Sequence, residues 1–228
     1  MQAQSRLSAL RVASTMTAMH LSGFIGELSE ELARRLGHTG VEWVPMSWDK
    51  LTAPDHPEYD IAVQIISIRP ERWEKVDFSE PFLLANQALL VRQDTPIAAA
   101  ASLEQLRPYL LGGMQGGAGT QCIREVIRPE QVSAEFDHPF TAGRALADGQ
   151  VDGLVFPAPV AIALSKQFKT TTVVGQITTN EEYGVVFDKG NPLREGVNGA
   201  LAAMRTDGTW RRIVDRWFPE MDELPRIG

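Results

Sequence analysis

The 228-residue sequence lacks the features that several classes of protein require. Its single cysteine, Cys122, excludes an intramolecular disulfide framework and a cysteine-based metal cluster. No run of about 18 apolar residues is present, so no segment is predicted to span a bilayer. Basic residues are also in the minority, and the net charge of −7 argues against nucleic acid or an anionic membrane surface as the main partner. No metal and no cofactor is expected.

The first ten residues, "MQAQSRLSAL", lack the basic-then-apolar order of a signal peptide. Two interpretations remain open at this point. The protein is cytosolic, or a leader has been removed and Met1 added for expression.

The remaining sequence alternates between strand and helix patterns. Residues 23–37 are predicted to form an amphipathic helix, because Phe24, Leu28, Leu32 and Leu36 recur every four residues. Strands are expected at 10–14, 41–46 and 59–67. Such alternation is typical of βαβ units with a mostly parallel sheet, so the predicted fold class is α/β.

The pattern restarts after Asp94. Ser102 and Gln105 have the spacing of a capping box, and further alternating segments follow up to about residue 177. The two halves therefore resemble separate α/β lobes. Two strands, "QALLVRQ" (87–93) and "YGVVFDK" (183–189), are predicted to connect the lobes as a hinge.

Residues 67–82, "SIRPERWEKVDFSEPF", resemble the signature of the bacterial extracellular solute-binding proteins of the polar amino acid type. The helix at 23–37, "YDIAVQ", "QALLVRQD", "EEYGVVFDKGNPL" and "DGTWRRIVDRWF" match the family in the same order. The resemblance covers about residues 9–219.

This resemblance implies a type 2 periplasmic-binding-protein fold that closes on a small ligand by hinge motion and delivers it to the membrane permease of an ABC importer. Residues 1–91 with 185–228 would form lobe 1, residues 92–184 would form lobe 2, and the ligand cleft would lie between them. The implied protein is a periplasmic or extracellular monomer whose leader is absent from this sequence, and it is not an enzyme.

Arg72 is the first candidate ligand-binding residue. A guanidinium matches a carboxylate bidentately and stays charged when desolvated. In the family, the matching arginine binds the α-carboxylate of the ligand, and the residue matching Ser67 adds a donor; Ile65 belongs to the same expected set. The alternative is that Arg72 only pairs with a nearby carboxylate on a solvated turn.

A glycine-rich segment, "GGMQGGAGTQ" (112–121), is the second candidate. Glycines before a helix let the backbone approach a ligand, and the first amides of a helix favour an anion. The family resemblance implies that Gln115, Gly119 and Thr120 contact the same carboxylate from the other lobe. An ordinary strand-to-helix connection is the alternative.

Two aromatic residues complete the expected ligand-binding set. Trp48 falls where the family places an aromatic wall, although a core tryptophan would look the same in sequence, and Phe156 ends a predicted strand. His20 is the histidine nearest to a predicted site loop and is expected at the surface or lining the pocket. No second metal ligand accompanies it at suitable spacing.

Two positions depart from the family pattern. Pro157 replaces the aspartate that pairs with the ligand's α-ammonium in amino-acid-binding relatives, and Thr15 replaces a common acidic residue. Because a buried ammonium without a counter-charge is costly, the ligand is expected to carry a carboxylate but no free α-amine, unless Glu181 or Glu182 supplies the charge. An aromatic or amide group could also replace the salt bridge.

Two other functions share this scaffold. A few relatives resemble dehydratases of cyclic acids, whose chemistry needs a positioned general acid. The same bilobed unit also occurs as the ligand-sensing domain of signalling proteins. No carboxylate is placed inside the cleft by the sequence, which favours the receptor, and no catalytic residue is assigned.

Overall fold

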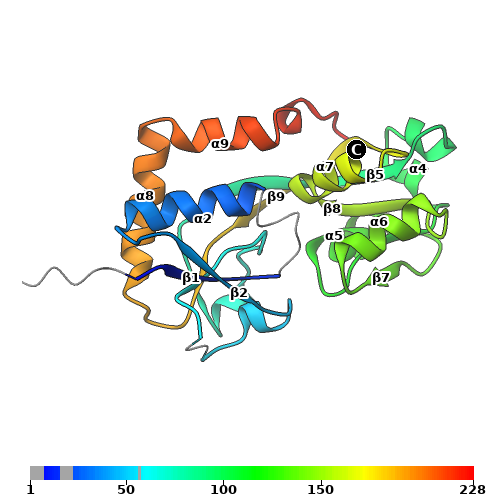
Figure 1. Cartoon of the computed structure of the whole chain (residues 1–228). Coiled ribbons are helices and arrows are strands. Elements are labelled where there is room, and N and C mark those ends of the chain that lie inside the picture. Colours follow the sequence, from blue (N-terminus) through cyan, green and yellow to red (C-terminus); the bar gives the residue numbers. More distant parts are fainter. Residues whose placement is uncertain (1–7, 16–22, 56–57) are drawn as a thin grey trace, which may run out of the picture. The chain divides into compact units, whose positions relative to one another are not determined.

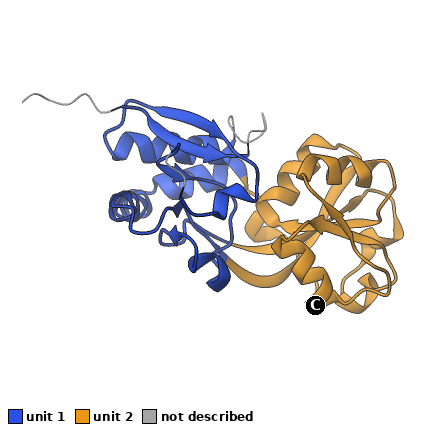
Figure 2. Ribbon diagram, turned by 90° about the horizontal axis from the view of Figure 1, so that it is seen from below, with its two compact units in different colours: residues 1–84, 182–217 blue, residues 85–181, 218–228 orange. Residues whose placement is uncertain are grey.

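The computed structural model describes residues 8–15, 23–55 and 58–228, and it divides into two compact units (Figures 1 and 2). Unit 1 comprises residues 1–84 and 182–217, and unit 2 comprises residues 85–181 and 218–228. Each unit is built around one five-stranded sheet, as far as the described residues show. The α/β class predicted from the sequence is confirmed. Across the same residues, no helix is both long and apolar enough to cross a membrane.

Unit 1 contains a mixed sheet in the order β2-β1-β3-β10-β4. β1, β2 and β3 are parallel, whereas β10 runs antiparallel to both β3 and β4. The elements are β1 (Leu10–Ser14), α2 (Phe24–Arg35), β2 (Val41–Pro45), a 3-10 turn (Lys50–Thr52), β3 (Ile61–Ala62), α3 (Pro70–Trp73), β4 (Asp77–Phe78), β10 (Val186–Phe187), α8 (Leu193–Thr206) and α9 (Thr209–Trp217).

The helix predicted at 23–37 is α2, and the sequence explains both of its ends. Its apolar face is buried, including Phe24, Leu28 and Leu32. The chain leaves the helix through Gly37, whose φ of 84° lies in the left-handed region that glycine adopts at little cost. The strand predicted at 59–67 is much shorter than expected, because only Ile61–Ala62 pair with neighbouring strands. The residues that follow form the loop that carries the candidate site.

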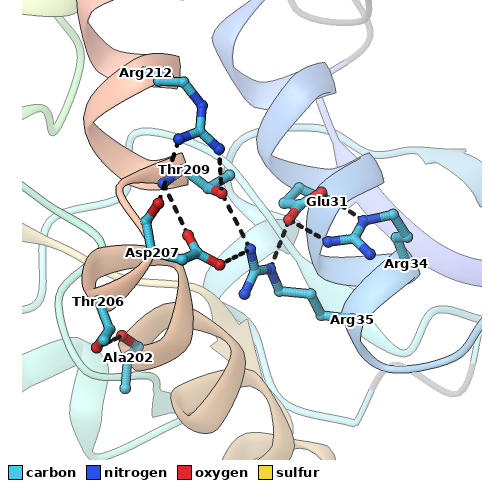
Figure 3. A network of polar contacts seen from close by, with 8 residues as sticks. All are labelled: Glu31, Arg34, Arg35, Ala202, Thr206, Asp207, Thr209 and Arg212. Carbon is cyan, nitrogen blue, oxygen red and sulfur yellow. Dashed lines mark hydrogen bonds and ion pairs between the residues drawn. The ribbon is translucent and has the colours of Figure 1, made fainter.

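Helix α9 is anchored on α2 by charged residues. Glu27 of α2 accepts hydrogen bonds from Arg216 and from the Trp217 indole, each at 2.7 Å. One turn later, Arg35 contacts Glu31 on its own helix and Asp207 between α8 and α9 (Figure 3). Ile213 and Val214 are the buried residues of α9.

Unit 2 contains the second sheet, in the order β7-β6-β8-β5-β9. β6 is parallel to β7 and β8, and β5 is antiparallel to β8. The elements are β5 (Leu83–Arg92), a 3-10 turn (Pro96–Ala99), α4 (Leu103–Leu106), β6 (Leu111–Met114), α5 (Ala118–Cys122), a π-helical turn (Ile123–Ile127), β7 (Ala134–Phe136), α6 (Pro139–Ala147), β8 (Gly153–Pro157), α7 (Ala158–Gln167), β9 (Thr171–Tyr183) and a 3-10 turn (Met221–Glu223). Ser102 and Gln105 form the predicted capping box of α4.

Two long strands, β5 and β9, run across the boundaries between the units, which fall at 84/85 and 181/182. The sequence predicted the first of these strands but divided the second into two pieces. Residues 171–183 form one continuous strand, so the return passage is made by β9 and not by 183–189.

The C-terminal residues 218–228 pack on unit 2, whereas the sequence-based division placed them in lobe 1. Ile227 is buried in the core of unit 2 beside Leu89 and Ile177. Its N–H donates to the carbonyl of Gln176 at 2.9 Å, and the Gln176 N–H donates to Pro225 at 2.8 Å. This tail therefore adds a short parallel bridge beside the edge strand β9 and covers backbone groups that an edge strand would expose.

Candidate functional site

The candidate site of unit 1 lies where three parallel strands end. Thr15 follows β1, Trp48 follows β2, and the loop 63–68 follows β3. Because β1, β2 and β3 are parallel, their carboxyl ends share one edge of the sheet, and ligands of open α/β sheets bind at such edges. The sequence predicted these three segments from separate motifs, and the fold brings them to one edge.

Arg72 lies on the short helix α3, whose first residue is Pro70. Its Nη1 donates to the carbonyl of Ser67 at 3.0 Å. Its Cζ lies 6.0 Å from the centroid of the Trp48 ring, within the range of a cation–π contact. A guanidinium has five N–H donors, so the contact with Ser67 uses one and fixes the orientation of the group. Arg72 thus contacts two other residues predicted as ligand-binding, Ser67 and Trp48.

Ser67 contributes to the candidate site through its backbone groups. The residue is buried and forms an isolated antiparallel bridge with Tyr183, and the N–H of Ile68 donates to the Glu182 carbonyl at 2.8 Å. These bonds fix the loop 63–68 against the end of β9. Ile65 is half-buried on the same loop.

Thr15 is half-buried and is held by a residue that the sequence-based prediction missed. The Gln64 side-chain Nε2 donates to Thr15 Oγ1 at 2.7 Å and to Ser14 Oγ at 3.3 Å. Its Oε1 accepts from the N–H of Ile65 at 3.1 Å. A signal was present in the sequence, because Gln64 is the one polar residue in the apolar run "IAVQII" (61–66).

In unit 2, the segment 112–121 forms the expected strand, turn and helix start, and Gly119 and Thr120 are buried within it. A Cβ at Gly119 would lie 1.9 Å from the Val155 carbonyl oxygen, so this glycine allows α5 to approach β8. Thr120 is buried, and its hydroxyl donates to the Met114 carbonyl. Gly119 and Thr120 therefore have packing roles, and a ligand could use only their backbone. The ligand contacts expected of Gly119 and Thr120 stay a prediction.

The other predicted residues of unit 2 differ in exposure. Gln115 is exposed, and its N–H donates to Phe136 at 2.9 Å. Phe156, which the sequence placed in the ligand-binding set, is 1 % exposed and belongs to the interior of the unit, so its side chain is not open to a ligand in this structure. Pro157 is half-buried at the start of α7 and pairs with Gln87 of β5.

Among the described residues, neither carboxylates nor metal-ligating side chains form a second candidate site near the residues above. Glu182 is exposed and Glu181 is half-buried on β9, whose end adjoins Ile68. Within the described ranges, no group of three histidine, cysteine or acidic side chains could hold a metal ion. His20 lies outside the described residues. Burial raises the pKa of the Cys122 thiol to about 12, so this thiol stays protonated and unreactive at neutral pH.

A separate groove of about 480 Å³ lies between α2 and α9 in unit 1. Arg34 pairs with Glu31 of its own helix at 2.8 Å (Figure 3). Arg216 of α9 pairs with Glu27 of α2 at 2.7 Å. The second pair joins the two helices, so the groove is best described as a packing junction.

The two α/β units agree with the comparisons to known proteins. Residues 13–220 match the model of the bacterial extracellular solute-binding proteins, family 3. The chain belongs to this family. The match includes every residue of the candidate site described above.

Several proteins similar to this chain are named for the amino acid that they bind. The chain is 29% identical over 201 residues to the L-cystine-binding protein TcyJ of Escherichia coli (strain K12), covering 87% of this chain and 74% of that protein. It is 30% identical over 164 residues to the ABC transporter glutamine-binding protein GlnH of Bacillus subtilis (strain 168), covering 72% of this chain and 59% of that protein. A solved ancestral arginine-binding protein bound to arginine has a TM-score of 0.78 at 31% identity, covering 92% of this chain and 98% of that chain.

Proposed function

We propose that this chain is the extracytoplasmic solute-binding component of an ABC importer and that Arg72 binds the carboxylate of its ligand. The observation that carries the proposal is the placement of Arg72. Its guanidinium is oriented by Ser67, lies over Trp48, and stands beside the carboxyl ends of three parallel strands. A charged donor that is held in place before binding loses little freedom when a carboxylate arrives.

The ligand class follows from the relatives and from the chemistry of arginine. The named relatives bind cystine, glutamine and arginine, all of which carry an α-carboxylate. A charge-assisted hydrogen bond contributes about 1.5–3 kcal/mol, so two of them account for a large part of the roughly 8 kcal/mol of a micromolar complex. Trp48 adds apolar contact beside the guanidinium.

The glycine-rich segment of unit 2 is proposed to contribute backbone N–H groups to the same ligand. Gln115 and Gly116 are the exposed residues of that turn, and Gly119 lets helix α5 approach β8. Closure of the two units on the ligand is part of this proposal, because a ligand stabilises a closed form only by contacts that the open form lacks. The membrane permease of the importer is the proposed partner.

The proposed ligand has a carboxylate but no free α-ammonium group. Pro157 and Thr15 are neutral residues at positions where amino-acid-binding relatives commonly carry acids. Gln64, which contacts Thr15, is also neutral. An ammonium at these strand ends would therefore lose hydration without gaining an ion pair.

Native mass spectrometry of freshly purified protein, followed by calorimetric titration, tests both the receptor function and the assignment of a ligand without an α-ammonium group. The titration uses matched pairs: L-glutamine with 4-carbamoylbutanoate, and L-arginine with 5-guanidinopentanoate. Binding of one des-amino compound more tightly than its amino acid supports the ligand assignment. Tighter binding of the amino acids would overturn that assignment while supporting the receptor function, and no binding of any carboxylate would overturn the function.

A dehydratase on the same scaffold is the second candidate. The named relatives are binding proteins, which favours a receptor. Proton NMR of the protein with a cyclic carboxylic acid separates the two functions, since a receptor leaves the compound unchanged and a dehydratase releases water from it.

A further inference from the structure

Gln64 is a buried amide that the ligand-binding motifs of the sequence do not include. Its side chain is among the most buried polar groups of unit 1, with 3 % exposure. Burying an amide is costly unless hydrogen bonds compensate for the lost water, so such a residue is retained in a core only where its bonds fix a particular arrangement.

The bonds of Gln64 join two strand ends. The carboxamide Nε2 reaches Ser14 and Thr15 at the end of β1. The carboxamide oxygen accepts from the N–H of Ile65, the residue that follows Gln64 in the chain. One side chain therefore sets the position of the Thr15 hydroxyl and the direction of the backbone that leaves β3.

The loop fixed in this way leads directly to Arg72. The N–H of Ile66 donates to the Gln64 carbonyl at 2.8 Å, and the next residue, Ser67, offers the carbonyl that orients Arg72 at 3.0 Å. A change in the carboxamide would therefore move both Thr15 and the carbonyl that holds the guanidinium.

We propose that Gln64 is a positioning residue for ligand binding, which acts through Thr15 and through the loop 65–67 that orients Arg72. It leaves the end of β1 neutral, with a hydroxyl beside the ligand's carboxylate site, and this arrangement suits an uncharged polar group of the ligand, such as a hydroxyl, carbonyl or amide. This inference rests on the proposed function of the same site.

The test compares Gln64→Met with a matched variant, Gln176→Met. Gln176 is also a buried amide; it hydrogen-bonds Asn86 at 2.9 Å and Leu224 at 3.0 Å, but it lies in unit 2, and among the described residues these bonds reach no candidate site residue. Both variants should lower the melting temperature. Only Gln64→Met should also weaken calorimetric binding of the tightest wild-type ligand among the matched pairs, by about tenfold, because the three side-chain hydrogen bonds that hold Ser14, Thr15 and the loop are lost.

Thr15→Val is a second variant that keeps the inference falsifiable if Gln64→Met folds poorly, and a double-mutant cycle with it applies where both variants fold. Unchanged affinity in Thr15→Val would overturn the inference. Thr15→Val is isosteric and removes the hydroxyl that Gln64 holds. Because Gln64 is proposed to act partly through this hydroxyl, Thr15→Val alone should weaken binding. The loss of affinity in the double variant should be smaller than the product of the losses in the two single variants.

Each outcome has a separate meaning. If wild-type protein binds none of the probes, the proposed function fails and the inference fails with it. If wild-type protein binds a probe while Gln64→Met binds equally well, or while the Gln64 and Thr15 effects are fully additive, the inference alone is overturned. Equal loss of affinity in Gln176→Met would also overturn it, because a general loss of stability would then explain the result.

Discussion

The guanidinium carbon of Arg72 lies 6.0 Å from the centroid of the Trp48 ring. This contact joins the residue after β2 to the short helix after β3, and it places a cation and an aromatic face at the same strand edge. Both groups suit a small organic acid, one by charge and the other by apolar contact.

Replacement of Arg72 by Ala should weaken ligand binding by at least about 100-fold, because two charge-assisted hydrogen bonds are lost. Arg72→Lys should be intermediate, since an ammonium keeps the charge but lacks the planar fork. The melting temperature of the unliganded protein should change by less than about 2 °C. Calorimetry and thermal unfolding measure the two effects.

Arg34→Ala is the matched control for Arg72→Ala. Arg34 is an exposed arginine on α2 that pairs with Glu31, and its loss should leave ligand affinity unchanged. Equal affinity of Arg72→Ala and wild-type protein would contradict the role of Arg72.

Trp48→Leu should weaken binding by about two- to fivefold, and Trp48→Phe should weaken it less. The estimate follows from the roughly 0.5–1 kcal/mol of a partly exposed cation–π contact. Trp48 also packs against the core that contains Leu51 and Phe78, so a small fall in stability is expected in both variants. Retention of full affinity in Trp48→Leu would show that the ring does not contact the ligand.

Gly119→Ala should destabilise unit 2 by about 1–3 kcal/mol, because the new methyl group would overlap the Val155 carbonyl. Gly199→Ala is the contrasting change. It lies in α8 with open space around the added carbon, and it should stabilise the protein by about 0.5–1 kcal/mol. Chemical denaturation measures the free energy of unfolding, which should fall in Gly119→Ala and rise in Gly199→Ala. An unchanged free energy of unfolding in Gly119→Ala would contradict the close approach of α5 and β8.

Ile227→Ala should destabilise unit 2 by about 2–4 kcal/mol, because Ile227 is buried in its core and a cavity would remain. Hydrogen exchange should increase along β9, where the tail is bonded. Arg226→Ala, which alters the exposed neighbour on the same tail, should cause neither change. Equal exchange in Ile227→Ala and wild-type protein would mean that the tail does not protect this edge.

The α2–α9 junction should weaken at low pH. The Arg35 hydrogen bond lowers the pKa of Asp207, and the Arg34 hydrogen bond is the main cause that lowers the pKa of Glu31. Groups whose pKa is depressed in the folded state stabilise it above their unfolded values of about 4, and this contribution is lost as the pH falls through the folded values. Arg35→Met should therefore lower the melting temperature at pH 7, and the difference from wild type should shrink below about pH 4. A difference that stays constant down to pH 2 would contradict this role.

Much of unit 1 could be predicted from the sequence because its signals are local. The apolar spacing of Phe24, Leu28 and Leu32 defines α2, and the motif around Arg72 identified a residue that does lie at a strand edge. The two-strand connection was also predicted in outline, although β9 proved to be one long strand.

The remaining features depend on contacts between segments that are distant in sequence. Thr120 looked like a ligand donor, but its hydroxyl bonds back to Met114, six residues earlier, in a turn that the sequence does not specify. Phe156 lies in a strand whose pairing with β5 and β6 buries it. The tail was assigned to the wrong unit because it is held by the backbone carbonyl and N–H of Gln176. Every residue type has these backbone groups, so the sequence does not reveal such a contact.

The assignment of the C-terminal tail to unit 2 has a practical use. β1 belongs to unit 1, while the chain ends on unit 2 beside Leu103. Fluorophores introduced near the two chain ends would therefore report on different units, and energy transfer between them would convert any ligand-driven rearrangement into an optical signal without a label near Arg72.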